Sequence, residues 1–364
     1  MNSMPVIKTL FKKIRKPHVS RRGFALLLCA ALMLSLCACG SGSKMEQKQI
    51  FAMDTVMTLT AYGKRAQEGI NAAASVINSM DAQLDPEIPT SIIYAINHAE
   101  GANIVVTPQI AKMLSTAKTV YDQSGGALDL SLYPVVKLWG FVDGRYYVPT
   151  DIELSAALVR KAYDKMILTS YPATGSYSVS FPAGTEISMA SVAKGCAAEN
   201  AVAAMRQAGV ESGIISLGGN VQTLGLKPDG SKWTVAIQDP KEPSGWVGTV
   251  QVGEMAVVTS GSYQRYFEYD GNTYHHIINP MSASPANNNL LSATIICEDG
   301  TMADALSTAM FVMGESRALN YWRTYGGFEM ILITKDGKVI CTKGLIDNYV
   351  PNTQAAGYTV RYSE

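Results

Sequence analysis

The sequence predicts an α+β fold, with mixed sheets and flanking helices in a single domain. Short β-branched and aromatic runs surround the turn signals Asp229-Gly230 and Asp270-Gly271, as expected for hairpins. Helical segments stand between groups of strands rather than after every strand, which disfavours a doubly wound parallel sheet. The 364 residues are 47% hydrophobic and 16% charged, so the chain is neither disordered nor fibrous and can bury a sizeable core.

The chain up to residue 207 predicts one strand and three helices. Residues 49–62 alternate apolar and polar side chains, as in a half-buried strand. A helix over 65–83 is rich in alanine and has apolar side chains at helical spacing. Residues 108–124 begin with a proline in the first turn and stop at two glycines, and residues 193–207 close before another glycine. Both are therefore predicted to be helices.

The second half predicts mainly strands, with one helix over 301–313. Residues 328–334 and 339–342 should pair as a hairpin across Asp336-Gly337. The turn signals at 229–230 and 270–271 should each join two neighbouring strands as a hairpin. The remaining strands are expected at 213–217, 233–238, 248–252, 256–259 and 263–269.

The N-terminal segment is typical of a targeting signal rather than of a part of the folded domain. A basic stretch ending at Arg22 precedes an apolar run of about 15 residues, too short to span a ~30 Å bilayer comfortably. The run ends in Leu36-Cys-Ala-Cys-Gly40, which resembles a bacterial lipobox, and a flexible Gly/Ser stretch follows. An ordinary secreted protein cut after Ala38 is the alternative. We expect a signal peptide over 1–38, a lipidated tether over 39–47 and the folded domain over 48–364.

Lipidation of Cys39 would supply two acyl chains, enough to hold the protein on the extracytoplasmic face of the cell membrane. The segment before Cys39 contains seven of the 30 basic residues and no acidic one, so the remainder has 23 basic against 30 acidic residues. This balance disfavours a nucleic-acid partner. Cys196, Cys297 and Cys341 remain in the body, an odd number, and we expect buried thiols, although one disulfide is possible.

Asp304 and Thr308 are four residues apart on the predicted helix 301–313, so their oxygens lie one turn apart on the same face. A carboxylate and a hydroxyl suit a hard cation such as Mg²⁺, which keeps positions open for water and phosphate. The alternative is a helix-start Asp stabilised by the dipole, with Thr bonded to a backbone carbonyl. On spacing alone, the structural role is the more common one.

Three other stretches have functional and structural interpretations. Lys194 and Gly195 open a helix, where a cation and free N–H groups can bind an anion, but a lysine there is often simply solvated. The glycines at 218–219 and the segment 259–262 allow close backbone approach or form turns. His275-His276 offers a general acid or base near neutral pH, or a structural hydrogen bond at a hairpin edge.

Together and in order, these stretches resemble the ApbE family of FAD:protein FMN transferases. The resemblance extends from about Lys48 to near Gly344. The matching segments are Met53-Asp-Thr-Val-Met57, Leu138-Trp-Gly-Phe141, Ala193-Lys-Gly195, Ser216-Leu-Gly-Gly-Asn220, Ile237-Gln-Asp-Pro240, Thr259-Ser-Gly-Ser-Tyr-Gln-Arg-Tyr-Phe267, His275-His-Ile-Ile-Asn-Pro280 and Ala303-Asp-Ala-Leu-Ser-Thr308.

The resemblance implies an ApbE-like (T-fold-like) catalytic domain that cleaves FAD at its pyrophosphate with Mg²⁺. FMN would be joined through a phosphoester to a Thr or Ser of a partner protein, and AMP released. The implied acceptors are membrane redox subunits with a sequon of the form Asp-Gly-x-(Ser/Thr)-Gly-Ala-(Ser/Thr).

The resemblance also assigns site residues. Asp304 and Thr308 would hold Mg²⁺ with an oxygen from Ser191, and His276 would be the base towards the acceptor hydroxyl. The positions that would line the FAD site are Met53, Ala127, Leu128, Asp129, Ser188, Lys194 and Ile277.

Several polar positions depart from the family pattern. Ser188, Asn220 and Asn279 stand where the family often has Asp, and Glu87 aligns with a common aromatic position near Tyr94. These departures concern the flavin and adenosine contacts and leave the metal pair and His276 intact. Two alternatives follow: an FAD pyrophosphatase that yields FMN and AMP, and a flavin-binding lipoprotein without catalysis.

Overall fold

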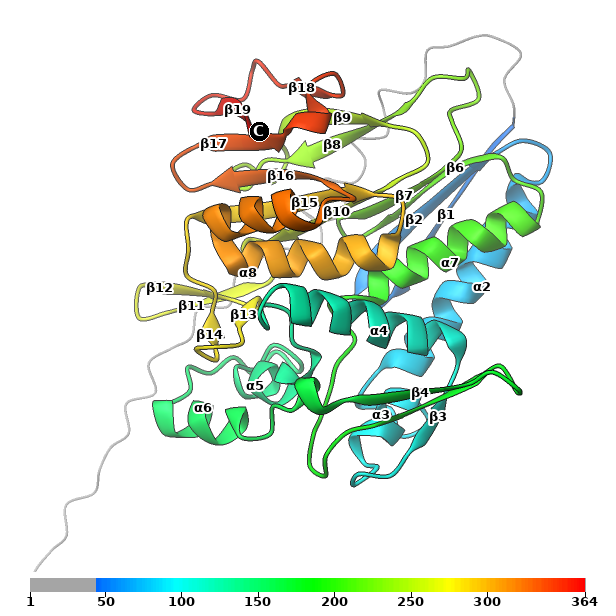
Figure 1. Ribbon diagram of the computed structural model, residues 1–364. Helices are drawn as coiled ribbons and strands as arrows, with labels where there is room; N and C mark the ends of the chain where they lie inside the picture. The colour runs from blue at the N-terminus through cyan, green and yellow to red at the C-terminus, as the bar shows by residue number, and fades with distance from the viewer. Residues whose placement is uncertain (1–43, 364) are drawn as a thin grey trace, which may run out of the picture.

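The computed structural model describes residues 44–363, so the predicted signal peptide and Cys39 lie outside the described part of the chain. Within that part, the main sheet has nine strands, antiparallel except for the last neighbouring pair (Figure 1). Their order is β1 (Met45–Ala52), β2 (Thr55–Tyr62), β6 (Ser212–Leu217), β7 (Asn220–Leu224), β10 (Ala256–Gly261), β15 (Leu290–Cys297), β16 (Glu329–Thr334), β17 (Lys338–Thr342) and β19 (Thr359–Ser363).

Helices cover one face of the main sheet, and a smaller sheet covers the other. Val258 and Ile295 belong to the core on the helical side, whereas their chain neighbours Val257 and Ile296 belong to the core under the smaller sheet. This alternation is the period of two expected for a sheet buried on both faces. The helices are α2 (Ala66–Leu84), α7 (Ala193–Gln207) and α8 (Gly300–Tyr325), with α4 (Pro108–Gln123) packed on α8; the smaller sheet is β18 (Tyr349–Pro351), β9 (Trp246–Val252) and β8 (Trp233–Gln238) (Figure 1).

The remaining elements lie below α4 and beside α8 in Figure 1. An aromatic and aliphatic cluster that includes Trp139, Phe141, Phe267 and Ile278 joins the region of α5 and α6 to two small hairpins. These elements are α3 (Ile92–Asn97), the sheet β3 (Ile104–Val106), β5 (Ser176–Ser180) and β4 (Ile167–Tyr171), α5 (Tyr133–Leu138), α6 (Asp151–Leu158), the hairpins β11 (Tyr266–Tyr269) with β12 (Asn272–His275) and β13 (Ile278–Asn279) with β14 (Ser284–Pro285), and the 3-10 turns η2 (Leu130–Leu132), η3 (Tyr163–Lys165) and η4 (Lys343–Leu345).

The single strand predicted over 49–62 is wrong, because this segment forms the hairpin of β1 and β2. Met53 and Asp54 make the turn with positive φ angles of 48° and 59°, and the Met53 N–H donates to Asp81 Oδ1 at 2.9 Å. The apolar alternation runs through both strands, so it hid the turn. β1 begins at Met45, inside the segment predicted as tether.

Of the other three predicted turns, two form hairpins as predicted and one does not. Asp270-Gly271 joins β11 to β12 and the 336–337 turn joins β16 to β17, as predicted. The hairpin predicted at Asp229-Gly230 is wrong, because this turn leads from β7 in the main sheet to β8 in the smaller one. The strand predicted over 263–269 begins only at Tyr266.

The helix predicted over 301–313 is confirmed, and it contains both predicted metal ligands. At Gly314 the backbone leaves the helical region with a φ of 73°, and a further helical segment then continues to Tyr325. Only the first part of α8 was predicted. A glycine suits this kink because a side chain is strained at positive φ.

Cys196, Cys297 and Cys341 are free and buried, as predicted. Among the described residues, no helix is long and apolar enough to cross a membrane.

Candidate active site

Asp304 lies in the second turn of α8 and is only 3% exposed. Its Oδ2 accepts a hydrogen bond from the Gly195 backbone N–H at 2.9 Å, and its Oδ1 accepts one from Asn220 Nδ2 at 3.0 Å. The ion pairs within residues 44–363 do not include Asp304. A buried carboxylate with neutral donors and no cationic side chain still lacks a compensating charge.

Two glycines bring α7 against the start of α8. A Cβ on Gly195 would lie 2.0 Å from the Gly300 carbonyl oxygen and 2.8 Å from Asp304 Cβ. A Cβ on Gly300 would lie 2.7 Å from the Gly195 oxygen. Only glycine allows this approach, and it places the N-terminus of α7, with its positive dipole end, directly at the carboxylate.

Thr308 lies one turn further along α8, half-buried, and its hydroxyl is 3.3 Å from Ser260 Oγ on β10. Ser260 Oγ is also 2.8 Å from Ser307 Oγ, which donates to the Asp304 carbonyl at 2.9 Å. Ser260 was not predicted as a site residue, although it lies in the segment 259–262 noted for close backbone approach. Ser191 is half-buried in the turn before α7.

The donor set fits Mg²⁺. Among the described residues, no group of three or more His, Cys, Asp or Glu side chains is placed to hold a metal ion. One carboxylate with nearby hydroxyls instead suits a hard cation that completes its octahedron with water and phosphate oxygens. The missing positive charge at Asp304 is the observation that carries this fit.

His276 follows β12, and its ring orientation is set by Arg265. The His276 backbone N–H and ring Nδ1 both bond the Arg265 carbonyl oxygen, at 3.0 and 3.1 Å. A carbonyl oxygen only accepts, so Nδ1 carries the proton and Nε2 is left with its lone pair. Burial, then the positive charges of Arg265 and Lys194, lower the pKa of His276 to about 3. The imidazole is therefore neutral at pH 7.

The hairpin that carries His276 is held by aromatic packing. Phe267 stacks on Tyr274 with ring centroids 5.3 Å apart, and the Phe141 ring meets His276 edge-on at 6.3 Å. The Arg265 guanidinium donates to the Phe141 carbonyl at 2.7 Å. These contacts fix the hairpin against the region of α5.

His275 has a different environment. Its Nε2 donates to the Ala286 carbonyl at 3.2 Å, and its ring meets Phe311 edge-on at 5.5 Å. Burial lowers the pKa of His275 to about 4, and its Nδ1 is buried without a partner among the described residues. Of the two neighbouring histidines, His275 uses Nε2 and buries Nδ1, whereas His276 Nε2 makes no hydrogen bond among the described residues.

The residues predicted to line the flavin site comprise four apolar residues and the polar residues Lys194, Asp129 and Ser188. Ala127, Leu128 and Ile277 are buried in the helical-side core, and Met53 packs against it. Lys194 is half-buried at the first turn of α7, close enough to His276 to depress its pKa.

Asp129 and Ser188 lie near each other through the turn η2. Asp129 is buried, its Oδ1 accepts from the backbone N–H and hydroxyl of Ser131, and its Oδ2 lies 3.6 Å from Lys161 Nζ. Burial raises the pKa of Asp129, and Ser131 and Lys161 oppose this shift. The Ser188 N–H donates to the Leu130 carbonyl at 3.0 Å.

The sequence model of the ApbE family matches residues 53–332. The chain belongs to the ApbE family. Among relatives named FAD:protein FMN transferase, that of Treponema pallidum (strain Nichols) is 29% identical over 343 residues, with 88% of this chain and 93% of the relative covered. That of Klebsiella pneumoniae (strain 342) is 32% identical over 252 residues, covering 69% of this chain and 77% of the relative.

Solved structures agree with the ApbE assignment and confirm the predicted α+β fold. The ApbE protein of Thermotoga maritima superposes with a TM-score of 0.74 at 25% identity, covering 81% of this chain and 96% of that one. The flavin transferase ApbE of Vibrio cholerae gives a TM-score of 0.70 at 25% identity, covering 80% and 94%.

All four positions expected to depart from the family pattern make hydrogen bonds, and Asn220 bonds Asp304 at 3.0 Å. The expectation that these positions leave the metal pair untouched is therefore wrong. Asn279 Oδ1 accepts from the Met281 N–H at 3.0 Å within the turn between β13 and β14. Glu87 accepts from Lys137 at 3.0 Å and from the Tyr133 hydroxyl. Ser188 Oγ accepts from the Ala190 N–H at 3.3 Å, so its hydroxyl stabilises the turn that leads to α7.

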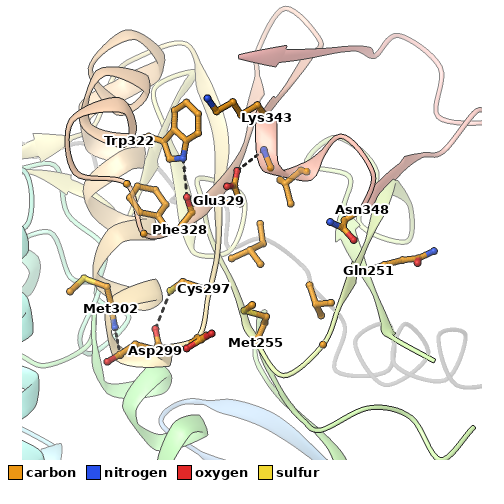
Figure 2. A pocket seen from close by; sticks show the side chains of 18 of the residues that line it. Gln251, Met255, Cys297, Asp299, Met302, Trp322, Phe328, Glu329, Lys343 and Asn348 are labelled. Carbon is orange, nitrogen blue, oxygen red and sulfur yellow. Dashed lines mark hydrogen bonds between the residues drawn. The ribbon is translucent and has the colours of Figure 1, made fainter. Parts of the chain in front are cut away.

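Two cavities differ in their relation to this site. One of about 700 Å³ is lined by Glu87, Tyr94 and Lys161, and so adjoins Asp129. The other, of about 810 Å³, lies between the ends of α8 and the smaller sheet, where Trp322 and Glu329 point into it (Figure 2). The second cavity contains none of the predicted site residues.

Proposed function

We propose that this ApbE-family protein is a Mg²⁺-dependent FAD:protein FMN transferase. It would transfer FMN from FAD to a Ser or Thr hydroxyl of a partner protein, forming a phosphoester and releasing AMP. The observation that carries the proposal is the buried Asp304 carboxylate, which has no cationic side-chain partner among residues 44–363 and lies at the N-terminus of α7. Relatives named FAD:protein FMN transferase support the same reaction.

Asp304, Thr308 and an oxygen of Ser191 would hold Mg²⁺, which when bound would neutralise charge on the pyrophosphate and on the departing phosphate. Lys194, in the first turn of α7, would bind the same anion through its ammonium group. The N–H groups of Ala193, Gly195 and Cys196 are already bonded, to Met189, Asp304 and Val192. Met53, which is half-buried and packs against the core that contains Leu128 and Ile277, would give the flavin end an apolar surface.

His276 would act as the general base. Its Nε2 would take the proton of the acceptor hydroxyl while the hydroxyl oxygen bonds to the FMN phosphorus. The anhydride bond between the two phosphates breaks, and AMP leaves with the bridging oxygen. The Arg265 carbonyl keeps the proton on Nδ1, which would leave the Nε2 lone pair for the acceptor hydroxyl. Such a base contributes roughly 10²–10⁴-fold in rate.

We also propose that the protein works at the extracytoplasmic face of the cell membrane, held by lipid on Cys39. The apolar run followed by Leu36-Cys-Ala-Cys-Gly40 supports this location. The acceptor would then be a membrane redox subunit that exposes a Ser/Thr sequon on the same side.

An FAD pyrophosphatase is the second candidate, in which water replaces the acceptor hydroxyl and FMN and AMP accumulate. Its basis is that Ser188, Asn220 and Asn279 stand where the resemblance implies Asp, which concerns the balance between transfer and hydrolysis. A flavin-binding lipoprotein without catalysis is less well supported, since binding alone does not need a neutral, oriented imidazole.

The test is incubation of the protein with FAD, Mg²⁺ and an acceptor fragment that carries the sequon, followed by intact mass spectrometry. A gain of one FMN on the acceptor supports transfer, whereas free FMN and AMP without a gain support the pyrophosphatase. Bound FAD without turnover would support a flavin-binding protein without catalysis.

Two variants test the assigned roles. His276→Ala should lose roughly 10²–10⁴-fold of transfer while still binding FAD, and Asp304→Ala should abolish both turnover and its dependence on Mg²⁺. His275→Gln is the matched control, because His275 contacts Ala286 and Phe311 rather than the site. Normal transfer by His276→Ala would contradict the base assignment.

A further inference from the structure

We propose that Asn220 positions the Asp304 carboxylate and keeps the cation site at a single negative charge. This inference rests on the proposed function, because it concerns the Mg²⁺ that Asp304 would hold. The proposal gives Asn220, which directly follows the β6–β7 turn, a part in metal binding.

The backbone places Asn220 at the carboxylate. Asn220 is the first residue of β7 and is 2% exposed. Gly218 and Gly219 precede it with positive φ angles of 54° and 102°, which make the tight turn from β6. The strand therefore restarts at the edge of α8, and the Asn220 side chain meets Asp304 across 84 residues of sequence.

Two neutral donors then fix the carboxylate. Asn220 Nδ2 bonds Oδ1 at 3.0 Å, and the Gly195 N–H bonds Oδ2 at 2.9 Å. With one donor on each oxygen, the carboxylate plane cannot rotate without breaking a hydrogen bond. Each carboxylate oxygen has a further lone pair, so both remain able to bind a cation. Outer partners of this kind commonly orient metal-ligating carboxylates.

The chemistry of the amide also sets the charge. Asn220 donates a hydrogen bond but brings no charge, whereas a carboxylate at the same place would put two anions about 3 Å apart. A single carboxylate binds Mg²⁺ weakly by itself and needs the phosphate oxygens of a substrate to complete the site. We therefore expect Mg²⁺ to bind this protein weakly before FAD arrives.

The experiment is a titration of Mg²⁺ alone into the full-length chain without FAD, followed by calorimetry and by the shift in melting temperature. Asn220→Asp should tighten Mg²⁺ binding by about tenfold or more, and should melt at a lower temperature than the wild type in chelator. Asn220→Ala should weaken Mg²⁺ binding by about ten- to a hundredfold, because Asp304 loses its orientation.

Asn97→Ala is the matched control. Asn97 is also buried, and it bonds the backbone of Ile187 in both directions, at 3.0 and 2.8 Å. It should lower the melting temperature without changing Mg²⁺ affinity, which separates positioning from stability.

Asp304→Ala separates a failure of the metal site from a failure of the role of Asn220. If Asp304→Ala abolishes the Mg²⁺ response while both Asn220 variants bind as the wild type does, the role of Asn220 is refuted and the metal site stands. If Asp304→Ala leaves the response intact, the metal site of the proposed function fails, and the inference on Asn220 fails with it. Should Asn220→Ala not fold, Asn220→Asp still decides, since unchanged affinity in that variant overturns the proposal.

Discussion

Gly195→Ala should damage stability and activity together. The added methyl group would lie 2.0 Å from the Gly300 carbonyl oxygen, where ordinary contact begins at 3.4 Å. Because the obstacle is backbone, no side-chain rotation relieves it, and α7 and α8 must separate by roughly 1.4 Å. That shift breaks the Gly195 N–H bond to Asp304.

The magnitude follows from two contributions. Overpacking costs about 1–3 kcal/mol, and loss of a hydrogen bond to a buried carboxylate costs about 1.5–3 kcal/mol. We expect the free energy of unfolding to fall by about 3–5 kcal/mol. Since a misplacement of about 1 Å in an active site can cost about 10²-fold in rate, transfer should fall at least that much even in the folded fraction.

Denaturant unfolding measures the stability of Gly195→Ala, and intact mass spectrometry of the acceptor measures transfer by the folded protein. Gly253→Ala is the control, because a Cβ there meets nothing within 4 Å, and it should stay within about 0.5 kcal/mol of the wild type. A Gly195→Ala protein with wild-type stability and transfer rate would refute the close contact of α7 and α8 as the support of the site.

Three further predictions concern other residues. The pKa of His275 is lowered from 6.5 to about 4, so its stabilising effect is present above pH 6.5 and is lost as the pH falls towards 4. Because His276, with a pKa of about 3, contributes a similar loss, His275→Gln should reduce but not remove the fall in unfolding free energy over that range. Ser260→Ala should remove the partner that orients the Thr308 hydroxyl and so raise the Mg²⁺ concentration needed for half-maximal transfer. Ser292→Ala, which removes a buried hydroxyl without a partner among the described residues, should leave that concentration unchanged. Cys39→Ser should abolish incorporation of labelled palmitate and release the protein from the membrane fraction; a lipidated variant would contradict the anchor.

Local signals predicted the parts of the site that lie within one element. Asp304 and Thr308 share a helix, so their spacing alone placed them on one face, and the glycine at 314 ended that part of α8. The turn at 336–337 also joined its neighbouring strands as predicted. In each of these cases the residues that decide the structure are within a few positions of one another.

Contacts between distant segments could not be predicted in this way. No periodicity links Asn220 or Ser260 to α8, since these contacts depend on the order of β7 and β10 in the sheet. The turn at Met53 was missed because apolar alternation continues on both sides of it. The turn at 229–230 carries a hairpin signal, yet the packing of the smaller sheet sends the chain elsewhere.

The proposed cation site and the proposed base are held by different parts of the fold. Asp304 is fixed where α7, α8 and β7 meet within the main core, so a change there acts on the fold and the cation site at once. His276 instead lies on a small hairpin supported by Phe141 and its aromatic neighbours, outside the main sheet. The His276 ring bonds the Arg265 backbone and meets Phe141, so we expect loss of its side chain to stop proton transfer and leave the main sheet intact. Variants of Gly195 and His276 therefore report on different things, and only the second isolates the chemical step.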